Sequence, residues 1–107
     1  MKVTVNVSTS FKQQAKPLLK RYVSLKDELT KLETELIANP RKSIPLGFDA
    51  YKIKLAVKSK HPGKSGGLRV ITCLETEIIG VIESEADNIE VTLISIFDKK
   101  ETANTSD

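Results

Sequence analysis

The sequence has few of the residues that most small enzymes use for catalysis. Its 107 residues include one cysteine, one histidine and no tryptophan. A single cysteine, Cys73, excludes an intramolecular disulfide and a cysteine-based zinc cluster, and in a strand pattern it is expected to be a small hydrophobe. A single histidine, His61, excludes a catalytic triad and a histidine cluster at metal-binding spacing.

Long hydrophobic runs are also absent. No apolar segment approaches the roughly 20 residues that span a bilayer, so no membrane role is expected. The first residues, MKVTVNVSTS, alternate apolar and polar side chains, which is typical of a strand and not of a secretory signal. The length fits one domain, 1–107, that ends in a polar tail at 100–107. A cytoplasmic location is expected.

The segment from Tyr51 to Leu74 has no carboxylate, although it holds six of the seventeen basic residues. Residues 1–49 carry nine basic and five acidic side chains, whereas residues 75–107 carry two basic and nine acidic ones. The net charge of +3 therefore hides a strongly polarised chain. Uncompensated lysine and arginine neutralise phosphates and release counterions, so this polarity indicates a nucleic-acid partner.

The N-terminal part is predicted to form one strand and two helices. Alternating valines at 3, 5 and 7 predict the strand, and Ser8 to Ser10 offer capping oxygens for a basic helix that Pro17 is expected to break or shorten. Ser24 and Asp27 resemble a capping box at the start of a second helix. Four leucines share one face of that helix, which is expected to end at Asn39-Pro40: Leu25, Leu29, Leu32 and Leu36.

The remainder is predicted to be mainly strands. RKSIPLGFDA (41–50) is expected to be a loop, YKIKL (51–55) a strand, and SKHPGKSGG (59–67) a basic glycine loop whose adjacent glycines allow close backbone approach. Residues 68–85 form two strands or one long strand, and a turn at 86–88 precedes a last strand at 89–97. The order β-α-α-β-β-β favours an α+β fold, with an antiparallel sheet and both helices on one face.

Strand alternation separates a core face from a basic face in the acid-free segment. Tyr51, Ile53 and Leu55 are expected to face the core, while Lys52 and Lys54 face outward beside Arg69. Such a cluster suits RNA cleavage, because a lysine crowded by cations has a lowered pKa and can act as base, and arginine stabilises the charge on the phosphorane. The alternative is a solvated sheet face.

Two other patterns have simpler interpretations. The glutamates at 75–77 and 83–85 lie in strand patterns without a polar pocket and are expected to be solvated. Lys-Ser-Gly-Gly at 64–67 lacks the spacing of a P-loop and precedes a strand instead of a helix, so it is weak as a nucleotide-binding motif.

The segments YKIKLA, GKSGGLRVI and LISIFDKKE, in this order, resemble the RelE/HigB-type toxins of the RelE/ParE superfamily. The resemblance covers nearly the whole chain. It implies a RelE-like fold and the toxin of a type II toxin–antitoxin module, an mRNA interferase that cuts mRNA in the ribosomal A site. It also implies attack by the substrate's own 2′-OH without metal or cofactor, and a cognate antitoxin as partner.

Matched positions carry over the family's functional residues. The resemblance makes Lys54 the candidate base, Lys52 a phosphate contact, Arg69 the group that stabilises developing charge, and Lys99 a residue that assists the leaving group. Three further lysines would contact ribosomal RNA or the mRNA backbone: Lys58, Lys60 and Lys64.

The chain departs from the family at its C-terminal end. Phe97 stands where relatives commonly have tyrosine, and the C-terminal helix with its own tyrosine is absent before Asp107. Activity is therefore expected to be weakened or lost, or residues to be missing from the natural protein. Apolar sheet surface left open by a missing helix could be covered by an antitoxin helix or by a second copy in a homodimer.

Two functional classes stay open. One is the ribosome-dependent endonuclease. The other is a non-catalytic binding protein, either a degenerate toxin that still binds an antitoxin or a ParE-like inhibitor of DNA gyrase. The Lys-x-Lys pair with a distant arginine favours the RNA-cleaving class.

Overall fold

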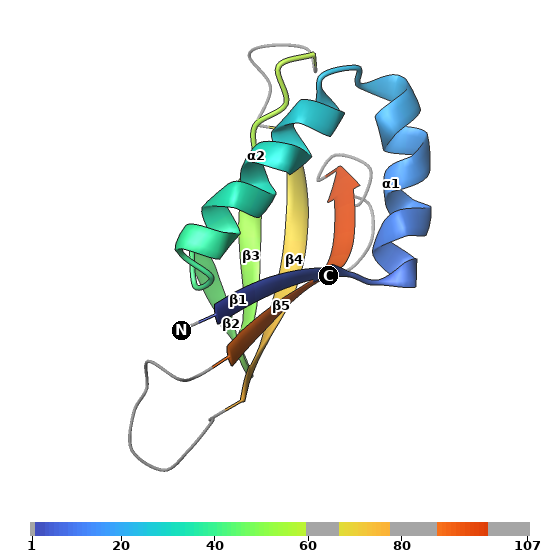
Figure 1. Cartoon of the computed structure of the whole chain (residues 1–107). Coiled ribbons are helices and arrows are strands. Elements are labelled where there is room, and N and C mark those ends of the chain that lie inside the picture. Colours follow the sequence, from blue (N-terminus) through green and yellow to red (C-terminus); the bar gives the residue numbers. More distant parts are fainter. Residues whose placement is uncertain (1, 60–66, 78–87, 99–107) are drawn as a thin grey trace.

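The computed structural model describes residues 2–59, 67–77 and 88–98. These residues form five strands and two helices in a single layered unit (Figure 1). In chain order the elements are β1 (Lys2–Val7), α1 (Thr9–Arg21), α2 (Leu25–Ala38), β2 (Ile44–Gly47), β3 (Ala50–Leu55), β4 (Leu68–Glu77) and β5 (Asn88–Asp98).

The strands form one mixed sheet, and the predicted α+β class is confirmed. The strand order is β1-β5-β4-β3-β2, with every neighbouring pair antiparallel except β1 and β5. The sequence had predicted a wholly antiparallel sheet, and the parallel pairing of β1 with β5 corrects that prediction. Parallel neighbours need a long connection, and the whole chain between β1 and β5 supplies one.

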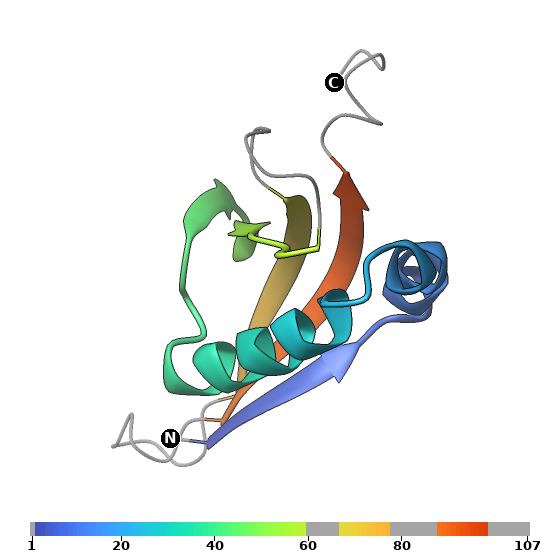
Figure 2. The same cartoon turned by 90° about the horizontal axis from the view of Figure 1, so that it is seen from above.

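The two helices follow β1, and they lie against different parts of the sheet. Figures 1 and 2 show α2 crossing one face while α1 stands beside the end of β5. Beyond the end of β1, α1 lies along the edge of β5. The Gln14 side chain accepts hydrogen bonds from the Ile96 N–H and the Ser95 hydroxyl, both at 2.9 Å. The helix therefore satisfies a strand edge that β1 leaves open.

The first helix begins as predicted but continues through its proline. The Ser8 hydroxyl accepts a hydrogen bond from Phe11 N at 3.0 Å, which confirms the cap. The prediction that Pro17 breaks the helix is wrong, since α1 runs without interruption from Thr9 to Arg21. Pro17 and Gln13, whose carbonyl loses its partner, are both exposed, so water can satisfy that carbonyl.

The second helix buries the predicted leucine face. Leu25, Leu32 and Leu36 are fully buried, and Leu29 packs against them. The prediction of a capping box is wrong, because the Ser24 side chain makes no cap hydrogen bond. It donates instead to Glu28 at 3.1 Å and exchanges hydrogen bonds with Ser59, which ties the end of the β3 segment to the start of α2.

The segment predicted as a loop contains an edge strand. Residues Ile44–Gly47 pair antiparallel with β3. All four residues of β2 are exposed, so the strand has no alternation of apolar and polar positions that would reveal it in the sequence. Its Pro45 is tolerated because an edge strand does not need every N–H in the ladder.

The strands after β3 are arranged mainly as predicted. Within the described residues β4 is one strand, and most of the second strand expected up to residue 85 lies outside them. The close approach expected at the glycine pair is confirmed for Gly67: it has a φ of +50°, and a Cβ there would overlap the backbone carbonyl of Leu55. Only glycine fits this junction between β3 and β4.

Candidate functional site: a basic sheet face

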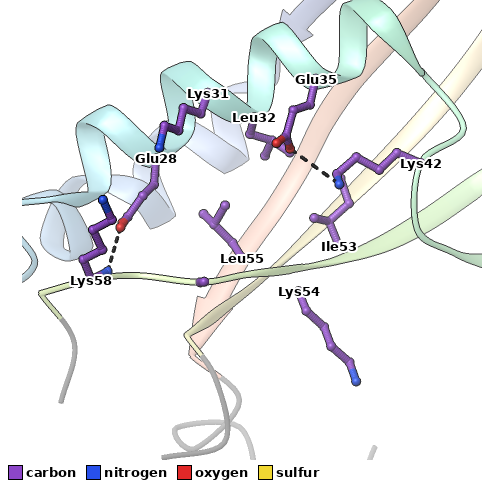
Figure 3. Close-up of a pocket in the computed structure, with 10 residues that line it drawn as sticks. Glu28, Lys31, Leu32, Glu35, Lys42, Ile53, Lys54, Leu55 and Lys58 are labelled. Atoms are coloured by element: carbon purple, nitrogen blue, oxygen red, sulfur yellow. Dashed lines mark hydrogen bonds and ion pairs between the residues drawn. The ribbon is translucent and has the colours of Figure 1, made fainter. Parts of the chain in front are cut away.

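Strand β3 separates packing from charge by alternation. Ile53 and Leu55 are buried beneath α2, whereas Lys54 is exposed and points away from that helix (Figure 3). Lys52 is half-buried and shares the side of Lys54, because alternate residues of a strand lie on the same face. Both lysines therefore lie on the sheet face opposite the helices, which we call the outer face.

The register of the sheet brings three predicted site residues together. Lys54 lies directly opposite Arg69 of β4, and Arg69 lies opposite Phe97 of β5. Directly opposed residues share a face and have Cβ atoms about 5 Å apart. Lys52 occupies the next row on the same face, opposite Ile71. We call Lys52, Lys54 and Arg69 the basic face.

Arg69 differs from the two lysines in exposure. Only 5% of its surface is accessible, and its Nη1 donates to the carbonyl of Leu68 at 3.5 Å. The guanidinium thus contributes positive charge from beneath the surface, while Lys54 is the cation presented to solvent. Electrostatic attraction from a buried cation is screened less than that from an exposed one.

The charges of the outer face are separated along the sheet. Lys52 and Lys54 form no ion pair with any residue in the described part of the chain. Exposed Glu75 and Glu90 lie opposite each other at the other end of β4, where Asn6 donates to Glu90 at 2.8 Å. The solvated state expected of Glu75 is confirmed, and the carboxylates lie two rows of the outer face beyond the row of Lys52.

Of the remaining predicted residues, the structure describes only Lys58, which does not lie on this face. Lys58 is exposed near the start of α2, and its backbone N–H donates to Glu28 at 2.6 Å (Figure 3). Lys60, Lys64 and Lys99 lie outside the described residues. The proposed site therefore consists, in the described part of the chain, of two lysines and one arginine, with Phe97 beside them.

A groove between α2 and β3 was not anticipated from the sequence. It has a volume of about 280 Å³, and Leu32, Ile53 and Leu55 form its apolar floor. Its rim mixes signs: Glu35 pairs with Lys42 at 3.5 Å, and the carboxylate of Glu28 is already engaged by Ser24 and Lys58 (Figure 3). These interactions are typical of a structural helix–sheet junction, so the basic face is the stronger candidate site.

The residues described here include no metal-binding cluster and one free cysteine. No three His, Cys, Asp or Glu side chains among them gather closely enough to hold a metal ion. Cys73 is a free, half-buried thiol on the outer face, so it is less buried than the sequence pattern predicts. No helix in residues 2–59, 67–77 and 88–98 is long and apolar enough to cross a membrane.

Comparison with known proteins adds no further constraint. The chain matches no family model, no curated protein and no solved structure.

Proposed function

We propose that this protein is the toxin of a type II toxin–antitoxin module and cleaves mRNA on the ribosome. The observation that carries the proposal is the basic face, where Lys54 lies directly opposite Arg69 with Lys52 in the adjacent row. The α+β architecture, with two helices after the first strand, is consistent with the RelE-like fold that the sequence resemblance implies. The cognate partners would be an antitoxin protein, the ribosome and its mRNA.

The chemistry of such a face suits cleavage by the 2′-OH of the substrate. In-line attack requires removal of a proton from the ribose hydroxyl and stabilisation of negative charge on the phosphorane. Lys54 is the exposed group that would take the proton in its neutral amine form and become an ammonium group, and Arg69 would stabilise the charge from below. Lys52 would hold a neighbouring phosphate. The predicted contribution of Lys99 to the leaving group extends this proposal.

A second candidate function is favoured by two observations. Arg69 is 5% exposed, so its planar fork is not open to a phosphate in this conformation. Phe97, which lies opposite Arg69, has no hydroxyl to offer. Both fit a non-catalytic member of the same fold that binds an antitoxin, or a relative that acts on DNA gyrase.

Cleavage on programmed ribosomes tests the proposal. Purified protein is added to ribosomes carrying mRNA and a P-site tRNA, and cuts are mapped by primer extension. Lys54→Ala should slow cleavage by at least about 100-fold, the lower range for loss of a general acid–base group. Lys31→Ala is the matched control, because Lys31 is an exposed lysine on α2. It should leave cleavage unchanged.

The other outcomes separate the alternatives. Equal loss in both lysine variants would indicate a general charge effect and would contradict the assignment of Lys54. If the unaltered protein does not cleave but blocks supercoiling by gyrase, the gyrase-directed alternative holds. If it does neither yet forms a complex with the product of the adjacent reading frame, it is a non-catalytic antitoxin-binding protein.

A further inference from the structure

The β2–β3 hairpin carries an unusual concentration of exposed apolar side chains. Ile44 and Leu46 are 44% and 49% exposed, and Phe48, at the tip, is completely exposed. We call these three residues the apolar hairpin. A tip that only reverses the chain does not need an aromatic residue, and an aromatic side chain gains nothing from full exposure to water.

The backbone at both ends of β2 is strained. Ser43, Phe48 and Asp49 have φ values of 91°, 52° and 62°, and they are the non-glycine residues with positive φ in the described part of the chain. A two-residue hairpin turn with positive φ at both central positions favours Asn-Gly. Here those positions are Phe48 and Asp49. A bulky side chain in this conformation is a true outlier, and such strain is typically kept where a function requires the side chain.

The strained tip is held in place by the neighbouring strand. The Leu74 N–H donates to the Asp49 carbonyl at 2.9 Å, and Gly47 pairs with Ala50 to close the turn. The hairpin therefore presents Phe48 on an anchored support.

The apolar hairpin adjoins the basic face. Ile44 lies directly opposite Lys52, so the two side chains share the outer face. On the same face, Lys54 follows Lys52 in the next row of β3. A strand rise of about 3.3 Å per residue places Ala50 roughly 13 Å from Lys54. A short length of extended single-stranded nucleic acid spans that distance.

We propose that Phe48 is a base-stacking residue for single-stranded RNA whose phosphates lie along Lys52 and Lys54. Every base has a π-face that can stack on an exposed aromatic ring, and binding proteins for single strands combine such rings with a cationic track. This inference rests on the proposed function for the identity of the nucleic acid.

The experiment separates stacking from folding by a substitution that relieves strain. Asparagine accepts positive φ readily, so Phe48→Asn should keep or raise Tm while it weakens binding. Binding is measured by fluorescence anisotropy with a labelled oligoadenylate at fixed salt. Phe48→Asn should raise Kd about 5- to 100-fold, the effect of losing one base–aromatic stack, and Phe48→Tyr should bind like the unaltered protein. Val23→Asn is the matched control, because Val23 is an exposed apolar residue between the two helices, 84% accessible.

An abasic oligomer of the same length tests the chemistry of the contact. It keeps the phosphates but offers no base to stack, so Phe48→Asn and the unaltered protein should bind it equally. An unchanged oligoadenylate Kd in Phe48→Asn, or no binding of oligoadenylate by the unaltered protein, would overturn the inference. So would dissociation of a dimer by Phe48→Asn with RNA binding intact, because the hairpin would then contact a second copy. In each case, cleavage that still depends on Lys54 would leave the proposed function standing.

Discussion

The two faces of the sheet are built from the same strands but follow different physical rules. On the face beneath the helices, Ile53, Val70 and Val91 are buried against the leucines of α2. On the outer face, exposed Lys54 lies directly opposite Arg69, so two basic side chains share one row. The first arrangement stabilises the fold by apolar burial, whereas the second gathers basic side chains on one face.

The comparison also separates two sets of lysines. Lys42, on the helix side, has a carboxylate partner in Glu35, and Lys31 and Lys58 line the groove that also holds Glu28 and Glu35. Lys52 and Lys54 make no such pair within the residues that the structure describes. A lysine with a carboxylate partner in the same chain contributes to the folded structure. Cations gathered without acids are available for an external anion.

The largest expected effect is a loss of stability from a substitution where α2 packs against the sheet. Leu32→Ala should lower the free energy of unfolding by about 2–5 kcal/mol, because Leu32 is fully buried and its loss leaves a cavity. Urea denaturation followed by circular dichroism measures the change. Lys54→Ala, at an exposed position, should stay within about 0.5 kcal/mol of the unaltered protein. Equal destabilisation by both variants would contradict the division between the faces.

An intermediate effect on stability is expected at Arg69, which lies on the outer face but is buried like a core residue. Arg69→Ala should lower the free energy of unfolding by about 1–3 kcal/mol, because groups that bond to a buried side chain lose their partner. The same variant should lose cleavage. Arg69→Lys keeps the charge without the planar fork and should restore only part of each property. If Arg69→Ala unfolds like the unaltered protein, the side chain is open to solvent, and the comparison with Lys54 must be revised.

The smallest effect concerns the salt dependence of RNA binding. Lys52→Ala should reduce the slope of log K against log salt by about 0.7, the value for one phosphate contact to a single strand. Titration of a labelled oligoadenylate at several salt concentrations measures that slope. The paired Lys42 provides the control, and Lys42→Ala should leave the slope unchanged. A slope that falls equally in both variants would show that the two sides of the sheet attract RNA alike.

Much of the fold could be predicted where the pattern in the chain is strong and local. Val3 and Val5 of β1, the leucines of α2 and the alternation in β3 each indicate directly which side packs on the core, although Val7 at the end of β1 is exposed. Predictions failed where local signals were weak or were overridden. Strand β2 has four exposed residues and no alternation, and the helix α1 tolerates Pro17 because only one exposed carbonyl loses its partner.

The candidate site was predictable in composition and only partly in geometry. Alternation assigned Lys52 and Lys54 to the outer face, but it did not indicate that Arg69, on the same face, is buried. The exposure and strain of Phe48 likewise had no sequence signal, because RKSIPLGFDA was expected to be a loop.

The sequence by itself determined which residues are apolar, which helices form and that one stretch of the chain carries cations without acids. These properties follow from side-chain chemistry and from the periods of helix and strand, which act over a few neighbouring residues. Only the tertiary structure decided that β1 joins the sheet beside β5, that Lys54 lies opposite Arg69 and that Phe48 is held at the tip of an edge hairpin. Strand pairing between distant segments and the accessibility of each side chain depend on how the whole chain packs.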